Sequence, residues 1–145
     1  MKTRSVFALA RYIVNKSVQD GEPVTNHGLQ QILFCIQSRF LRNGKAAFDE
    51  EFEAWKSGPV VPEVYNHLFR FHERPIDSFI ATGDEYDMTD AEKAEIDDII
   101  LASRLLTVDE VSLLIEQPGG AWSRTYGDGK FYHRIIHKKV IGQVA

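Results

Sequence analysis

The stretch Leu29-Gln-Gln-Ile-Leu-Phe-Cys-Ile36 has the strongest helical periodicity in the chain. Apolar residues recur here at intervals of three and four, which is the spacing of one face of an α-helix. They are Leu29, Ile32, Leu33, Ile36 and Phe40. Thr25 or Asn26 can cap the N-terminus of this helix, and Asn43-Gly44 ends it. We therefore predict a helix from about residue 25 to 41 and expect it to be the central helix of the fold.

Helix signals also occur in segments on both sides of this one. We predict helices at 6–18, 63–71, 89–105 and 107–115, with a short helical turn at 121–126. Two of them begin with a capping box, in which Thr89 and Thr107 accept from the backbone while Glu92 and Glu110 reach back. Pro62 suits the first position of the helix that follows it. The chain is therefore mainly helical.

From Phe48 the apolar period changes from helical to alternating. Phe48, Phe52 and Ala54 fall on one side of an extended segment, and acidic residues fall on the other. Trp55 lies on the acidic side, so its ring must be covered by something other than the main core. We predict one compact multi-helix domain over residues 1–145, mainly α, with a small β element around residues 48–56. A short strand is also expected at 78–80.

Composition excludes several classes of protein. The chain has 145 residues, a formal net charge of −4 and 43% hydrophobic residues, which is ordinary for one globular domain. No stretch approaches the about 20 apolar residues of a membrane span, and the single cysteine, Cys35, permits no internal disulfide. These features predict a cytoplasmic protein without a membrane. The acidic balance argues against bulk electrostatic binding of nucleic acid.

The residue types of common catalytic and metal sites are present, but their pattern is weak. His133 and His137 would share a face on a helix, yet exposed helix histidines are a better interpretation than metal ligands. Cys35 stands in the most apolar helix, where its thiolate is disfavoured. A hydrolase using Glu51 or Glu53 with His67 or His72 remains an alternative. We expect no enzyme activity, no cofactor and no metal.

DNA binding is the main alternative, ahead of the hydrolase. The helix at 25–41 turns its apolar face to the core, which leaves polar side chains outside that can read base edges. These are Gln30, Gln31, Gln37, Ser38, Arg39 and Arg42. A transcriptional regulator of phage or prophage origin would use this helix.

The most unusual block of the sequence is Phe52-Glu-Ala-Trp-Lys-Ser-Gly-Pro-Val-Val-Pro-Glu-Val-Tyr65. Trp55, Gly58 and two prolines make a rigid connection, and rigid apolar groups lose little entropy on binding. The block equally suits a packing corner in which Trp55 folds back on its neighbours. If it binds a partner, we expect the surface to consist of Trp55, Lys56, Gly58, Pro59, Val60 and Val61, with Trp122 and Tyr126 as a second patch.

This block also resembles the Panacea domain, or SocA-like antitoxin domain, found in GepA-type phage-associated proteins. Members carry an apolar helix, then Phe-x-Ala-Trp-x-x-Gly-Pro-Val-Val-Pro, then Val-Tyr opening a helix. The matching residues here are Phe52, Ala54, Trp55, Gly58, Pro59, Val60, Val61, Pro62, Val64 and Tyr65. A leucine-rich helix followed by Pro118 and Trp122 is similar to the family's closing step.

The resemblance implies a function that composition does not. It implies a mainly helical antitoxin that neutralises a cognate toxin, encoded nearby, by direct protein contact. One branch of the family delivers the toxin to a protease, so a protease is a second implied partner. The chain departs from the family in two places. Gln31 stands where members often have Lys, and Glu116 and Gln117 stand where members often have a His before the Pro-Trp step.

Overall fold

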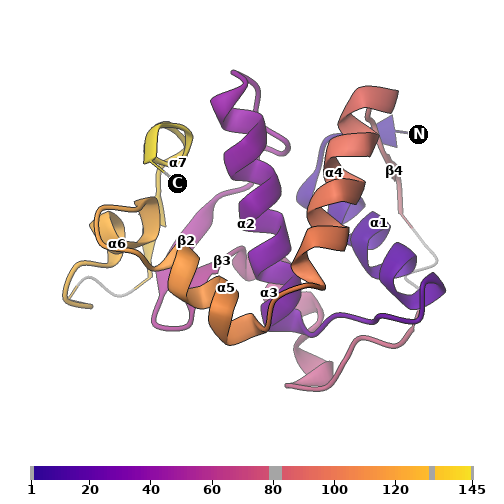
Figure 1. Cartoon of the computed structure of the whole chain (residues 1–145), viewed down its shortest axis with the longest axis horizontal. Coiled ribbons are helices and arrows are strands. Elements are labelled where there is room, and N and C mark those ends of the chain that lie inside the picture. Colours follow the sequence, from indigo (N-terminus) through magenta and orange to yellow (C-terminus); the bar gives the residue numbers. More distant parts are fainter. Residues whose placement is uncertain (1, 79–82, 131–132, 145) are drawn as a thin grey trace.

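A computed structural model describes residues 2–78, 83–130 and 133–144. One long helix, α2 (Asn26–Arg42), stands at the centre. Helices α1 (Val6–Gln19) and α4 (Asp90–Ser103) lie on one side of it, and a small sheet with α6 (Ala121–Tyr126) and α7 (Lys138–Val144) lies on the other (Figure 1). The fold is mainly helical with a small β element, as predicted. The strand expected at 78–80 falls mostly outside the described residues.

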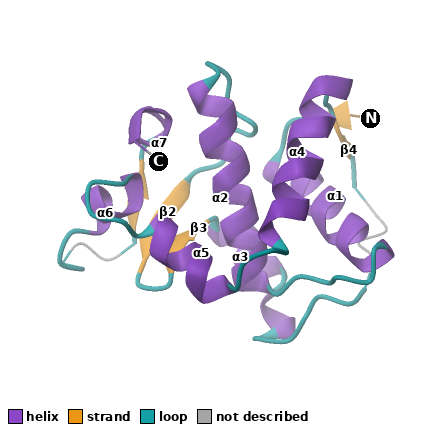
Figure 2. Ribbon diagram, in the orientation of Figure 1, coloured by secondary structure: helices purple, strands orange, loops and turns teal. Residues whose placement is uncertain are grey.

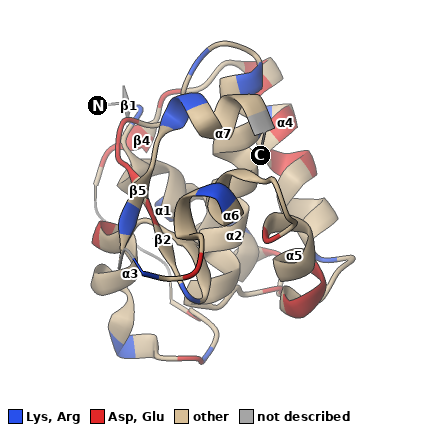
Figure 3. Cartoon of the chain, turned by 90° about the vertical axis from the view of Figure 1, so that its left-hand side faces the viewer, with Lys and Arg blue, Asp and Glu red and all other residues tan. Residues whose placement is uncertain are grey.

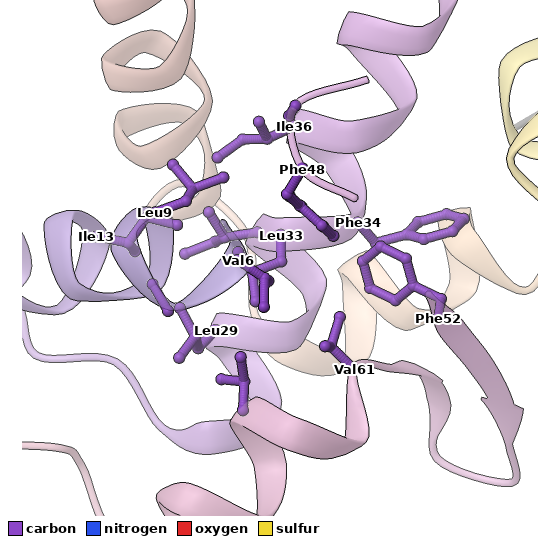
Figure 4. Close-up of a cluster of buried hydrophobic side chains, with 14 of the residues drawn as sticks. Val6, Leu9, Ile13, Leu29, Leu33, Phe34, Ile36, Phe48, Phe52 and Val61 are labelled. Carbon is purple, nitrogen blue, oxygen red and sulfur yellow. The ribbon is translucent and has the colours of Figure 1, made fainter. Parts of the chain in front are cut away.

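Helix α2 is buried on nearly all sides, which explains its central place. Thr25 caps it by accepting from the backbone N–H of Gly28 at 3.0 Å. Leu29, Leu33 and Ile36 meet Val6, Leu9 and Ile13 of α1 in the core, while Phe34 points the other way, toward Phe52 (Figure 4). The rings of Phe34 and Phe52 pack edge to face at 5.2 Å. The two sides of the core therefore join through α2.

Helix α2 also has buried polar residues, and each of them has a hydrogen-bond partner. Gln37 accepts from the N–H of Ala47 at 2.7 Å and donates to the carbonyl of Phe48 at 3.0 Å. Gln30 accepts from the N–H of Val61 at 2.8 Å. Buried amides of this kind fix loops that lack secondary structure of their own.

The sheet is larger than predicted. β2 (Phe52–Trp55) is its central strand, between β3 (Gly58–Val60) and β5 (Arg134–Ile136), and both pairings are antiparallel (Figure 2). Pro59 is tolerated because β3 is an edge strand. A second, two-stranded sheet pairs β1 (Lys2–Thr3) with β4 (Glu85–Tyr86) in parallel.

The C-terminal segment corrects the sequence analysis. Residues 134–136 form a strand, so the interpretation of His133 and His137 as histidines on one helix is wrong. His133 has a φ of 54° just before β5. Short apolar runs such as Ile135-Ile136 fit a strand as well as a helix. The helix that does form, α7, packs closely against α2, where a Cβ on Gly142 would lie 3.3 Å from Leu41.

The remaining helices agree with prediction in place, with small differences in extent. α3 (Pro62–His67) starts at Pro62, and a separate 3₁₀ turn, η1 (Phe69–Phe71), completes the expected segment. Phe69, at the start of this 3₁₀ turn, is 50% exposed although it is a large apolar residue. Both capping boxes form, at the starts of α4 and of α5 (Val108–Ile115).

Candidate functional site

Trp55 lies at the end of β2, with its ring covered by aromatic neighbours. His133 stacks on it at 4.2 Å between ring centroids, and Tyr65 meets it edge to face at 5.0 Å. The indole N–H donates to Glu53 at 2.9 Å. The expectation that something other than the main core covers this ring is confirmed. His133 was not singled out as its neighbour, because β5 was not recognised.

The rest of the proline corner lies inside the molecule. Lys56 and Ser57 form the exposed turn of the β2–β3 hairpin, and Gly58 takes a φ of 123° that favours glycine. From Gly58 to Val61 every residue is buried, and Val61 is 0% exposed. Of the six corner residues predicted to bind a partner, only Trp55 and Lys56 therefore reach the surface. The other four shape the corner, and a binding role for the set stays a prediction.

Trp122 and Tyr126, the second predicted patch, belong to α6 and stack on each other at 4.6 Å. Trp122 is 9% exposed, and its indole N–H donates to the main-chain carbonyl of Trp55 at 2.8 Å. Tyr126 is half-buried. The two patches are thus one connected structure, in which Trp122 fastens α6 to the hairpin.

Beside this corner lies an open groove of about 830 Å³. Its floor is the face of α2 from Gly28 to Arg42, and its walls are the end of α4, helix α5 and the segment from Gln117 to Gly120. The corner holds one of these walls, because Trp122 follows Gly120 in the chain with only Ala121 between them. The Oε2 atom of Glu116 lies against Gly58, 3.9 Å from the place where a Cβ would stand.

Helix α5 leaves an unusual amount of apolar surface uncovered. None of its residues is fully buried, and Leu113 and Leu114 are 74% and 57% exposed. In the preceding turn Leu105 and Leu106 are 83% and 40% exposed. Contiguous exposed apolar side chains mark interaction sites on soluble proteins. Sequence periodicity did not reveal this, since the same spacing is typical of a helix packed on a core.

The charges around the groove differ from those of the whole chain. Arg39 and Arg42 line it at the end of α2, and Arg104 lines it while it pairs with Asp20 at 3.1 Å. Glu22 is the one acidic side chain among the lining residues that the structure describes. Elsewhere, acidic residues gather on α4 and at the start of α5, and basic ones on β5, α6 and α7 (Figure 3). The open floor is therefore locally basic.

Two ionisable groups by the groove respond to its environment. Burial raises the pKa of the Cys35 thiol, which Arg39 and Arg42 oppose, so the thiol is not an activated nucleophile. Burial also raises the pKa of Glu116, which His27 opposes. Within the described residues, neither side chain has a hydrogen-bonded partner of the kind that activates a nucleophile.

A comparison with known families now identifies the domain. The family model described as "Antitoxin SocA-like, Panacea domain" matches residues 29–123, which is more than half of the chain. The chain belongs to this family. The Panacea match begins in α2, contains the whole corner and ends at Ser123, just after Trp122. It therefore covers the floor of the groove and the walls formed by α5 and residues 117–120.

One curated relative can be placed beside it. The chain is 33% identical over 90 residues to a protein named Antitoxin SocA from Caulobacter vibrioides. The aligned part is 61% of this chain and 42% of the relative, so the chain spans less than half of that protein's length. No solved structure matches the Panacea-domain chain.

The structure contradicts the side-chain placement on which DNA reading by α2 depended. Gln30, Gln31, Gln37 and Ser38 were expected to face outward, and all four are buried. Gln31 donates to the carbonyl of Val108 at 3.1 Å and to the Ser112 hydroxyl at 2.9 Å, which ties α5 to α2. Only Arg39 and Arg42 are exposed. With four of the six predicted side chains buried, α2 does not present the row of polar side chains that was expected to read base edges.

The acid–base pairing expected of a hydrolase is not formed either. Glu51 is exposed and bonds Lys138 at 2.8 Å, while Glu53 receives the Trp55 N–H and lies 3.6 Å from His133. His67 packs on Phe7 and His72 on Phe69, so neither histidine is the partner of these carboxylates. Within residues 2–78, 83–130 and 133–144 no group of three His, Cys, Asp or Glu could hold a metal ion. Nor does any helix in those ranges have the length and apolar character to cross a membrane.

Proposed function

We propose that this Panacea-domain protein is a cytoplasmic, non-enzymatic antitoxin that neutralises a toxin encoded nearby by binding it directly. The observation that carries the proposal is an open apolar groove in a domain of an antitoxin family. The groove is bordered by Leu106 and Leu114, which are 40% and 57% exposed. Leucine side chains exposed to water do not stabilise a monomer, and contiguous exposed leucines are explained by a surface that binds a partner.

The proline corner supports the same function in a different way. Its two prolines, of which Pro59 is buried, and the bond from Trp122 to Trp55 hold the adjoining wall of the groove in place before a partner arrives. A preformed surface loses less conformational entropy on binding than one that must order itself. Lys56 is exposed at the edge of this structure and Trp55 and Tyr126 are half-buried there, so these three are the candidates for further contact.

The test is co-expression with the protein encoded by the adjacent gene. That protein, expressed alone from an inducible promoter, should arrest growth, and co-expression of this chain should restore it. The two proteins should then co-purify as a complex of fixed stoichiometry. Co-expression of this chain with an unrelated toxin is the control, and it should not restore growth.

Titration of the purified pair separates binding from chemistry. Neutralisation that is complete only when the antitoxin reaches a stoichiometric amount supports masking. Complete neutralisation by a small fraction of that amount would show turnover and contradict a non-enzymatic mechanism. If the adjacent protein stays toxic in the presence of this chain and does not co-purify with it, the proposal is wrong.

Delivery of the toxin to a protease is a finer possibility that the same experiment measures. A masking antitoxin leaves the cellular level of the toxin unchanged or higher, because the complex protects it. An adaptor lowers that level, and the level recovers when the protease is inactivated. Immunoblots of the toxin with and without this chain distinguish the two.

A further inference from the structure

The second proposal rests on the antitoxin function and concerns what fills the groove. We propose that it receives one amphipathic α-helix of the partner protein, with the apolar face on α2 and α5 and acidic side chains toward Arg39 and Arg42. Three features of the groove carry this: its apolar walls, the absence of a strand edge in it, and its charge.

The apolar walls match one face of a helix. Ile32 of α2 lies in the floor, and Val111, Leu114 and Ile115 of α5 line the side. The residues of α2 that line the groove run from Gly28 to Arg42, which is about 20 Å at the rise of an α-helix. A partner helix of about four turns fits that length, and helix-in-groove complexes use anchors spaced by three and four residues.

An extended peptide would find no strand edge to pair with there, because no strand residue lines the groove. Strand addition needs a free sheet edge, whose N–H and C=O groups pair with the incoming chain. The floor and two walls of this groove are helices, whose interior backbone groups bond within the helix. The open edges of β3 and β5 belong to the sheet on the other side of α2. The groove therefore offers no strand edge to an extended peptide, and its helical floor and helical walls suit side-chain packing with a helix.

The positive charge of the groove favours a partner helix with acidic side chains on its polar face. Arg39 and Arg42 lie one turn apart at the C-terminal end of the floor, and both are exposed. In the part of the chain that is described, neither forms an ion pair with a carboxylate, whereas Arg104 is paired with Asp20. A partner with Asp or Glu near that end gains two charge-assisted bonds that the free protein lacks.

A second copy of this chain does not fit as the occupant. Its most acidic helix is α4, but Ile96 and Ile100 of α4 are 0% exposed in its own core. The apolar face that would have to enter the groove is thus already used. α5 is apolar and has two exposed acidic residues, Asp109 and Glu110, in its first turn, but its apolar residues Val111, Leu114 and Ile115 already line the groove of their own chain.

Neighbouring residues of α5 supply a matched pair of variants. Leu114 lines the groove, and Leu113 is more exposed but lies outside it. With the adjacent gene's product as the probe, Leu114→Asp should weaken binding by about tenfold or more, as loss of an anchor does. Leu113→Asp should change the dissociation constant by less than about twofold. Circular dichroism of both variants should match the parent, since neither leucine is buried.

A second pair tests the charge. Arg39→Glu should weaken binding by about tenfold and make it less sensitive to salt, because a favourable contact becomes repulsive. Lys139→Glu, an equal change of charge on an exposed residue of α7 outside the groove, is the control. Hydrogen exchange of the complex should show protection on α5 and on one helical segment of the partner that contains Asp or Glu.

The outcomes separate this inference from the antitoxin function. If the unmodified chain binds the toxin and Leu114→Asp and Arg39→Glu bind as tightly as it does, the groove proposal is wrong and the antitoxin function stands. Protection confined to a strand or loop of the partner would also overturn the groove proposal. A dimer of this chain that Leu114→Asp dissociates would show that a second copy is the occupant. Failure of the unmodified chain to bind overturns both proposals.

Discussion

The indole N–H of Trp122 donates to the main-chain carbonyl of Trp55 at 2.8 Å, across 67 positions of sequence. This bond joins the start of α6 to the turn of the β2–β3 hairpin. The two tryptophans, which the sequence analysis assigned to separate surface patches, are therefore in direct contact and together hold α6 against the hairpin. The segment between α5 and α6, which forms a wall of the groove, is held at its far end by this contact.

Trp122→Phe should therefore destabilise the protein. Phenylalanine keeps the ring stack on Tyr126 but removes the donor, which leaves the Trp55 carbonyl without this partner in a largely buried place. The expected cost is about 1–2 kcal/mol in the free energy of unfolding, measured in urea. Trp55→Phe is the control, because it leaves the main-chain acceptor in place. Equal stability of Trp122→Phe and the parent would show that water replaces the bond without cost.

Gln37→Leu should be more damaging than its conservative volume suggests. The amide of Gln37 is 0% exposed and satisfies both the N–H of Ala47 and the carbonyl of Phe48. Leucine leaves two buried backbone groups unpaired, each worth about 1–3 kcal/mol. We expect a clear loss of stability in urea unfolding, with Arg39→Gln on the same helix within about 0.5 kcal/mol of the parent. A neutral Gln37→Leu would contradict a structural role for this amide.

Much of the helical fold was predictable because local signals decide it. The capping boxes at Thr89 and Thr107 form as expected, and the apolar period of α2 places Leu29, Leu33 and Ile36 in the core. In each case helix propensity, capping and burial favour the same structure, so long-range packing does not change the outcome.

The errors occur where packing partners far along the chain decide the outcome. Gln30, Gln31 and Gln37 look solvent-facing by periodicity, but each serves a loop or helix that sequence alone cannot place beside α2. Strand β5 exists because β2 has an open edge, about 80 positions earlier. The exposed face of α5 could not be inferred, because its apolar spacing is the same whether a core or a partner covers it.

Trp55→Ala should weaken toxin neutralisation while leaving the helical content intact. Its ring is half-buried among Tyr65 and His133 at the edge of the structure, outside the main core. Loss of an aromatic anchor commonly costs about 2 kcal/mol or more of binding. Growth rescue and the dissociation constant report the binding, and circular dichroism reports the fold. If the variant unfolds instead, Trp55 is a structural residue and the contact surface lies elsewhere.

His72→Gly should stabilise the protein. His72 has φ 54° and ψ −123°, almost the conformation of Gly127, which has φ 58° and ψ −120°. Glycine adopts this region readily, whereas a side chain there costs of order 1 kcal/mol or more. The thermal midpoint should rise for His72→Gly and fall for the reverse test, Gly127→Ala. A fall for His72→Gly would show that its edge contact with Phe69 outweighs the backbone strain.

Glu116→Gln should raise stability at neutral pH, and the gain should vanish in acid. Burial raises the pKa of this carboxyl, and His27 only partly offsets it. A carboxyl whose pKa is higher in the folded protein than in the unfolded chain favours folding when protonated, so its contribution declines as pH rises through the folded pKa. Glutamine is neutral at every pH of the experiment, so the free energy of unfolding of the variant does not decline for this reason. Urea unfolding of parent and variant between about pH 4 and pH 7 measures the difference.

Glu110→Gln is the control. Glu110 is an exposed carboxylate, and the amide oxygen of the glutamine can still accept the hydrogen bond of the capping box at the start of α5. Parallel stability curves for the parent and Glu116→Gln would mean that the carboxylate by Gly58 is as well solvated as one in water.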